Sequence, residues 1–123
     1  MNAALWAVQV ILAIMFMMAG AMKLMKDKDE LAEKMGWVED LSQSTIQLIG
    51  TAEVLGAIGM VSTALTGIAP ILTPLAASGL AVVAMGAMVV HIRRHEYPMA
   101  LMTMMLAAMS VFVAWGRFGP EAF

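Results

Sequence analysis

The stretch AALWAVQVILAIMFMMAGAM, residues 3–22, decides the fold of this chain. It holds no charged residue before Lys23, and at about 20 residues it has the length that an α-helix needs to cross the hydrocarbon core of a bilayer. A cleavable signal peptide is the rival interpretation, but no basic segment precedes the run and no clear cleavage pattern follows Ala21. The stretch therefore predicts a membrane-spanning helix.

The composition of the whole chain supports this prediction. Of its 123 residues 62% are hydrophobic and 13% are charged, which is about half the charged share of a soluble domain. A soluble protein of this size needs a polar coat that these residues cannot supply. The net charge of −2 disfavours nucleic-acid binding. The absence of cysteine excludes disulfides, Fe–S clusters and thiolate metal sites.

Three more apolar runs follow the first, separated by short polar or turn-forming segments. The predicted spans are residues 3–24, 44–65, 71–92 and 99–115. Backbone groups in lipid must be satisfied within each segment, so the runs are predicted to be helices. The expected fold is all-α: one domain, residues 1–123, forming an integral membrane antiparallel four-helix bundle.

The first loop differs from the rest of the chain because its charged residues crowd together. Within residues 27–41, apolar side chains recur at three- and four-residue spacing, and Trp37 lies among them. This pattern predicts a short interfacial helix between the first two spans, with Trp37 at headgroup depth. A solvated connector is the alternative interpretation.

Lysine and arginine counts predict the orientation. Six of the seven lie in loops 23–43 and 93–98, and only Arg117 lies on the other side. The positive-inside rule places both loops in the cytoplasm and both termini outside, in a bacterial inner membrane.

Glu53 is the most informative polar residue. It lies about nine positions inside its span, roughly 14 Å of helix rise from the loop, where a carboxylate facing lipid costs a few kcal/mol. Gly50, Gly56 and Ala57 lie on the same helix face, so this face is predicted to pack against neighbouring helices.

Small residues also accompany the other polar positions, because Gly20 precedes Lys23 by one turn and Ala84 and Ala87 lead to His91. By topology these groups reach the bundle from one side. The predicted intramembrane polar cluster contains Glu53, Lys23, His91, Arg93, Arg94 and Glu96. Two interpretations stay open: a structural clamp that fixes helix register, or a site for a quinone head group, a proton or a small polar substrate.

The sequence gives less support for a metal site or for catalytic residues. His91 and His95 have one-turn spacing, but no third ligand follows at motif spacing, so no metal is expected. The 15 methionines are spread over every span and are interpreted as apolar filler rather than a Cu(I) site. No catalytic residue is identified.

Together, the motifs at residues 19–24, 50–57, 86–96 and 114–117 resemble those of the DoxX-like membrane proteins. The shared patterns are AG-x-x-K-L, G-x-x-E-x-x-G-A, GA-x-x-x-H-x-R-x-x-E and a closing A-W-G-R. This resemblance implies a four-helix protein of the bacterial cytoplasmic membrane. The family is named after a subunit of a thiosulfate:quinone oxidoreductase, and its relatives are linked to membrane redox complexes.

The sequence-based prediction is therefore an accessory or small subunit of a membrane redox complex. It is expected to have no activity and no resident cofactor of its own, with quinone as the candidate ligand. The expected partners are lipid and either a membrane protein or further copies of this chain. Two alternatives remain: a small oligomeric proton-coupled transporter, and a non-catalytic membrane assembly protein.

Overall fold

The structure is a computed structural model that describes residues 2–27, 29 and 42–121. Its helices are α1 (Asn2–Met25), α3 (Gln43–Thr66), α4 (Leu72–Arg93) and α5 (Tyr97–Phe118). Each of the four contains a segment long and apolar enough to cross a membrane. The all-α fold with four membrane-length helices is therefore confirmed. Of the predicted interfacial helix at residues 27–41, only Asp27 and Asp29 are described, so that prediction lies outside the described residues.

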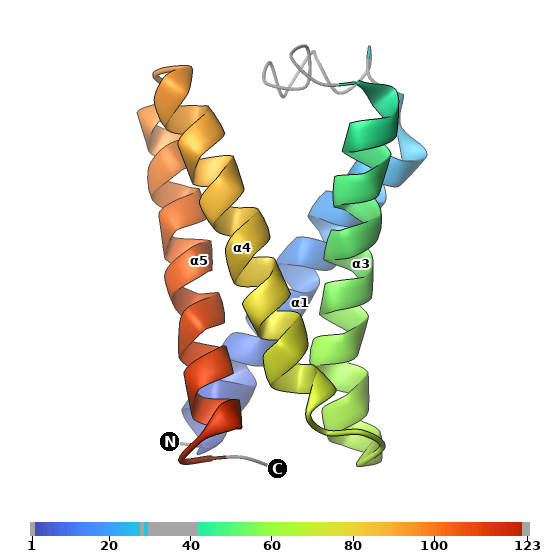
Figure 1. Ribbon diagram of the computed structural model, residues 1–123, viewed down its shortest axis with the longest axis vertical. Coiled ribbons are helices and arrows are strands. Elements are labelled where there is room, and N and C mark those ends of the chain that lie inside the picture. The colour runs from blue at the N-terminus through green and yellow to red at the C-terminus, as the bar shows by residue number, and fades with distance from the viewer. Residues whose placement is uncertain (1, 28, 30–41, 122–123) are drawn as a thin grey trace.

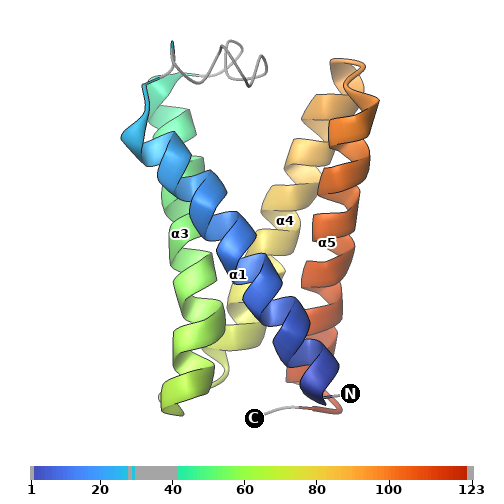
Figure 2. The ribbon, with the colours of Figure 1, turned by 180° about the vertical axis from the view of Figure 1, so that it is seen from behind.

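The bundle consists of two helix pairs. Helix α1 packs most extensively on α3, and α4 packs most extensively on α5. The α1–α3 pair and the α4–α5 pair lie close together at the end that holds both chain termini and the α3–α4 turn, and they diverge toward the other end (Figure 1). We call these the termini end and the loop end. Helix α1 runs diagonally from α5 at the termini end to the start of α3 at the loop end (Figure 2).

Apolar side chains pack between the helices and also cover the outside. The core includes Leu12 and Phe16 of α1, Met60 of α3, Leu80 of α4 and Val113 of α5. Large apolar side chains are exposed on all four helices; examples are Ile14, Leu55, Val82 and Met105. Water would penalise such a surface, whereas lipid tails solvate it, so the exterior suits membrane embedding.

Several hydroxyl side chains within the helices form hydrogen bonds to their own helix. The hydroxyls of Thr51 and Ser110 each donate a 2.8 Å hydrogen bond to a backbone carbonyl one turn earlier in their helix. This arrangement lets a hydroxyl lie in an apolar segment without an unsatisfied donor. Pro98 lies in the first turn of α5, where its missing N–H leaves no helical bond unmade.

Two glycines let α1 and α3 approach closely at the loop end. A Cβ atom built on Gly20 would lie 2.7 Å from the carbonyl oxygen of Gly50, and one built on Gly50 would lie 2.9 Å from that of Gly20. Both distances are too short for real atoms, so only glycine permits this contact. It fixes the positions of Lys23 and Glu53, which follow one turn later on each helix.

Candidate functional site

Lys23 of α1 and Glu53 of α3 form a buried ion pair. Lys23 Nζ lies 2.7 Å from Glu53 Oε1, and the two side chains are 8% and 6% exposed. The close backbone approach at Gly20 and Gly50 brings these side chains together. Each charge neutralises the other in a region where an isolated charge would be strongly penalised.

His91 and Glu96 form a second polar pair at the end of α4. His91 Nδ1 lies 2.8 Å from Glu96 Oε1, and Arg94 Nε lies 3.5 Å from Glu96 Oε2. The hydrogen bond to His91 is the main cause that lowers the pKa of Glu96 from its ordinary value, and the positive charge of Arg94 also lowers it. An ionised carboxylate only accepts hydrogen bonds, so Nδ1 carries the proton in this contact.

The backbone of His95 positions this second pair. His95 adopts a left-handed conformation, with φ of 59°, directly after α4. The chain reverses there, and the N–H of Glu96 donates a 2.8 Å hydrogen bond to the carbonyl of His91. A left-handed residue that closes a helix with such a bond is a known C-terminal motif. It brings the Glu96 carboxylate back beside the imidazole of His91.

A pocket of about 340 Å³ lies between the two polar pairs. Lys23 and Glu53 border it from α1 and α3, and His91 borders it from α4. Its remaining walls are apolar and are formed by Ile49, Val83, Gly86, Ala87 and Val90. The pocket therefore combines an apolar interior with three ionisable groups, the usual composition of a small-molecule site.

The remaining predicted residues lie in or around this arrangement. Arg94 contacts Glu96, whereas Arg93 is exposed. His95 Nδ1 lies 3.0 Å from the hydroxyl of Tyr97, so the two histidines face different partners.

Among the predicted packing residues, Ala57 and Ala84 are buried in the core, and Ala87 lines the pocket. A Cβ built on Gly56 would lie 2.8 Å from Leu80, which indicates close packing of α3 and α4.

Sequence reasoning missed a third polar group, at the termini end. Arg117 is only 3% exposed, and its Nε donates a 2.6 Å hydrogen bond to Gln9 Oε1. Its Nη1 donates to Asn2 Oδ1 at 2.7 Å and to the backbone oxygen of Glu121 at 2.9 Å. The available signal was Gln9, the one polar side chain in the apolar stretch 3–22. A polar residue there requires a partner from another helix.

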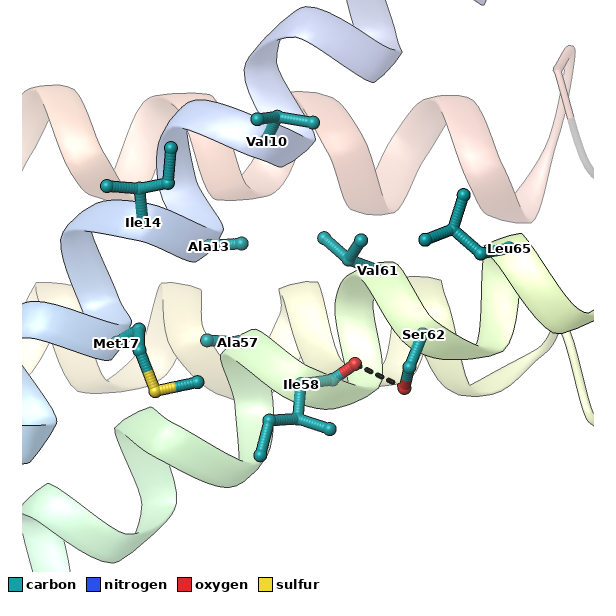
Figure 3. A pocket seen from close by; sticks show the side chains of 9 residues that line it. All are labelled: Val10, Ala13, Ile14, Met17, Ala57, Ile58, Val61, Ser62 and Leu65. Atoms are coloured by element: carbon teal, nitrogen blue, oxygen red, sulfur yellow. Dashed lines mark hydrogen bonds between the residues drawn. The ribbon is translucent and has the colours of Figure 1, made fainter.

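A second groove, of about 490 Å³, runs between α1 and α3 on the outside of the bundle (Figure 3). Its walls are apolar except for Ser62, whose hydroxyl donates a 2.6 Å hydrogen bond to the carbonyl of Ile58. The shape of this groove suits an apolar chain, but none of its lining residues is ionisable. The pocket beside Lys23, Glu53 and His91 is therefore the candidate functional site.

A family model described as the DoxX-like family matches residues 7–113. The chain belongs to the DoxX-like family. No curated protein and no solved structure matches the chain. The matched region of this DoxX-like protein includes all three ionisable residues that border the pocket, and it ends before Arg117.

Proposed function

We propose that this DoxX-like protein is a small accessory subunit of a redox complex in the bacterial inner membrane, and that its pocket receives the head group of a lipid-soluble quinone. The observation that carries the proposal is the pocket between Lys23–Glu53 and His91. Quinones dissolve in the bilayer and reach a site among transmembrane helices without crossing water.

The chemistry of the pocket suits such a ligand. A quinone ring is flat and largely apolar, and its two carbonyl oxygens accept hydrogen bonds at opposite edges. The ammonium group of Lys23 borders the pocket and can donate a hydrogen bond to a quinone oxygen. The imidazole of His91 borders it from another helix; because its Nδ1 proton is bonded to Glu96, its Nε2 is an acceptor for the hydroxyl of a reduced quinone. A volume of about 340 Å³ lies within the range of small-ligand pockets.

An accessory role fits the residues better than electron transfer by this chain alone. The sequence contains no cysteine, so it supplies no thiolate for an Fe–S cluster or a disulfide relay. In the proposed complex, a partner carries the electrons, and this chain holds the quinone in the membrane beside that partner.

Quinone binding by the purified protein in lipid nanodiscs tests the ligand. We expect saturable binding of a short-chain quinone by the wild type. Binding should be about tenfold weaker in Glu53→Gln, which removes the charge that positions the Lys23 ammonium group, and in His91→Ala, which removes a polar group of the pocket wall. Ala87→Phe should block binding because the new ring fills the pocket. Ile58→Ala, in the separate α1–α3 groove, is the matched control and should bind as the wild type does.

Equal and non-saturable uptake of quinone by the wild type and all variants would refute the proposed ligand, since it would report simple partition into lipid. The accessory role has a separate test. Mild solubilisation of native membranes should recover the tagged chain together with a redox protein in fixed stoichiometry. Recovery of the chain alone or only with copies of itself would refute this role.

Glu53 favours one second candidate, a proton-coupled transporter, because its buried carboxylate borders a pocket between the two helix pairs. In such transporters a membrane carboxylate binds proton and substrate in turn. Proteoliposomes with an imposed pH gradient should then accumulate a substrate, and Glu53→Gln should abolish the uptake. Uptake of substrate that is equal in both proteins would remove this candidate.

A further inference from the structure

The termini end holds all four helices together through a polar clamp, which we define as Arg117, Gln9, Asn2 and Thr73 with the carbonyl of Met60. Arg117 joins α5 to α1 through Gln9 Oε1 at 2.6 Å and Asn2 Oδ1 at 2.7 Å. Gln9 Nε2 then donates to the Met60 carbonyl of α3 at 3.1 Å. The hydroxyl of Thr73, on α4, donates to the same carbonyl at 3.3 Å.

Packing at this end is as close as the hydrogen bonding. A Cβ atom built on Gly116 of α5 would lie 2.7 Å from the side chain of Leu5, which is fully buried. The guanidinium group of Arg117 also lies 5.7 Å from the ring centre of Trp6. These contacts connect the α1–α3 pair to the α4–α5 pair with little free space.

At the loop end, by contrast, tight contacts form within each pair. Lys23 binds Glu53 inside the α1–α3 pair, and His91 binds Glu96 inside the α4–α5 pair. The pocket of about 340 Å³ lies between the pairs. On α4, buried residues extend from Thr73 to Ala84, and His91 is the next one. The same divergence of α4 from α3 is visible from both sides (Figures 1 and 2).

We infer that the two helix pairs move as two bodies about the polar clamp, so that the pocket widens and narrows at the loop end. Each pair keeps its own ion pair or hydrogen bond during this motion, while the spacing between Glu53 and His91 changes. In hinge and rigid-body motions of proteins, packed units rotate about an interface while each unit keeps its internal contacts. The motion would admit a ligand from the membrane and then enclose it, and only this last step rests on the proposed function.

Distances between paired spin labels test the motion directly. The chain contains no cysteine, so two introduced cysteines carry the only labels. Leu48→Cys with Val89→Cys reports across the pairs toward the loop end, and Leu65→Cys with Val111→Cys reports across the pairs toward the termini end; all four residues are exposed. Leu24→Cys with Leu48→Cys, both exposed within the α1–α3 pair, is the matched control.

We expect the distance distribution across the loop end to be about twice as wide as the other two. In Gln9→Leu, which loses a clamp contact but keeps an apolar side chain, the distribution across the termini end should widen as well. Arg117→Lys should also widen the distribution across the termini end, because lysine lacks the fork of donors that reaches both Gln9 and Asn2. A loop-end distribution as narrow as the control in the wild type would overturn the inference.

The same experiment distinguishes failure of the proposed quinone ligand from failure of the inferred motion. Addition of a short-chain quinone should narrow the loop-end distribution if the pocket closes on it. A wide loop-end distribution that quinone leaves unchanged, together with non-saturable quinone uptake, would refute the ligand and keep the motion. Narrow distributions in every labelled pair, together with saturable quinone binding, would refute the motion and keep the ligand.

Discussion

The 2.7 Å contact between Lys23 Nζ and Glu53 Oε1 neutralises two charges that lipid would penalise separately. Loss of one partner leaves the other buried and alone. We therefore expect Glu53→Leu and Lys23→Met each to lower the free energy of unfolding by about 3 kcal/mol. Unfolding in mixed micelles, followed by circular dichroism, measures this change.

The double variant Lys23→Met/Glu53→Leu supplies the control for that prediction. It removes both charges together, so its stability should return to within about 1 kcal/mol of the wild type. Destabilisation by the sum of the two single changes would show that the two groups act independently, and would contradict the importance of the pair.

Glu96 gives the molecule a predictable response to acid. The hydrogen bond from His91, together with Arg94, lowers the pKa of Glu96, so folding favours the ionised carboxylate. Its stabilising effect is therefore complete above the pKa of the unfolded chain, about 4.3, and is lost as the pH falls through the lower pKa of the folded protein. Wild type should melt at a higher temperature than Glu96→Gln at pH 7, and the difference should shrink below about pH 4.

Asp29→Asn is the matched control for this titration, because Asp29 is an exposed carboxylate near the same end of the bundle. Its melting temperature should follow that of the wild type across the whole pH range. A difference between wild type and Glu96→Gln that grows as the pH falls below 4 would contradict the predicted sign.

Arg117 marks the limit of sequence reasoning about single residues. The positive-inside rule counts it as one charge on the far side of the membrane. In the structure it is buried and binds Gln9, a residue 108 positions earlier in the chain. The polar side chain of Gln9 within an apolar run indicates that a partner is needed, but local sequence patterns do not identify a partner so far along the chain. Glu53, in contrast, could be identified because a charge inside an apolar span needs a partner.

At the scale of helices, the glycine contact between α1 and α3 makes the sharpest prediction. A Cβ on Gly50 would lie 2.9 Å from the carbonyl oxygen of Gly20 and 2.9 Å from the Cβ of Lys23. The backbone of Gly20 cannot move aside as the end of a flexible side chain can. Gly50→Ala should therefore destabilise the protein by about 2 kcal/mol. Equilibrium unfolding of the variant measures this loss.

Gly79→Ala, on α4, is the matched control because a Cβ there would meet no atom within 4 Å. It should be neutral or stabilise the protein by up to about 1 kcal/mol, since alanine favours helix more than glycine does. Equal destabilisation by both substitutions would show that glycine at these positions serves no close approach.

Helix positions could be predicted from sequence because charged segments separate the apolar runs, except between the second and third runs, where the uncharged turn at residues 66–70 separates them. The expected fourth span, residues 99–115, is shorter than α5, which extends from Tyr97 to Phe118. The predicted limits rest on Pro98 and Gly116, because proline and glycine often mark helix ends. In the structure, Pro98 occupies the first turn, and Gly116 continues the helix where it packs against Leu5.

For the whole molecule, the placement of both termini at one end predicts a shared side of the membrane (Figure 1). Single cysteines at Asp29 and Pro120, both exposed, would lie on opposite sides. In intact spheroplasts, a membrane-impermeant thiol reagent should label Pro120→Cys and leave Asp29→Cys unlabelled until the membrane is opened. Labelling of Asp29→Cys alone would reverse the predicted orientation.

The global fold was easier to predict from sequence than the candidate site. Four apolar runs in a chain with few charges leave helices in a membrane as the consistent solution. The contact between His91 and Glu96 depends instead on a left-handed backbone at His95, a conformation that is uncommon for any residue other than glycine. The pocket depends on the angle between two helix pairs, which arises from contacts far apart in sequence.

The bond between Gln9 and Arg117 also sets an order of events during synthesis. The ribosome adds Arg117 108 residues after Gln9, which at cellular elongation rates is a delay of about 5–20 s. During that interval the first helix has left the exit tunnel, while the carboxamide of Gln9 still awaits its final donor. The insertion machinery, or water held near it, has to form hydrogen bonds with this amide until the last helix is inserted.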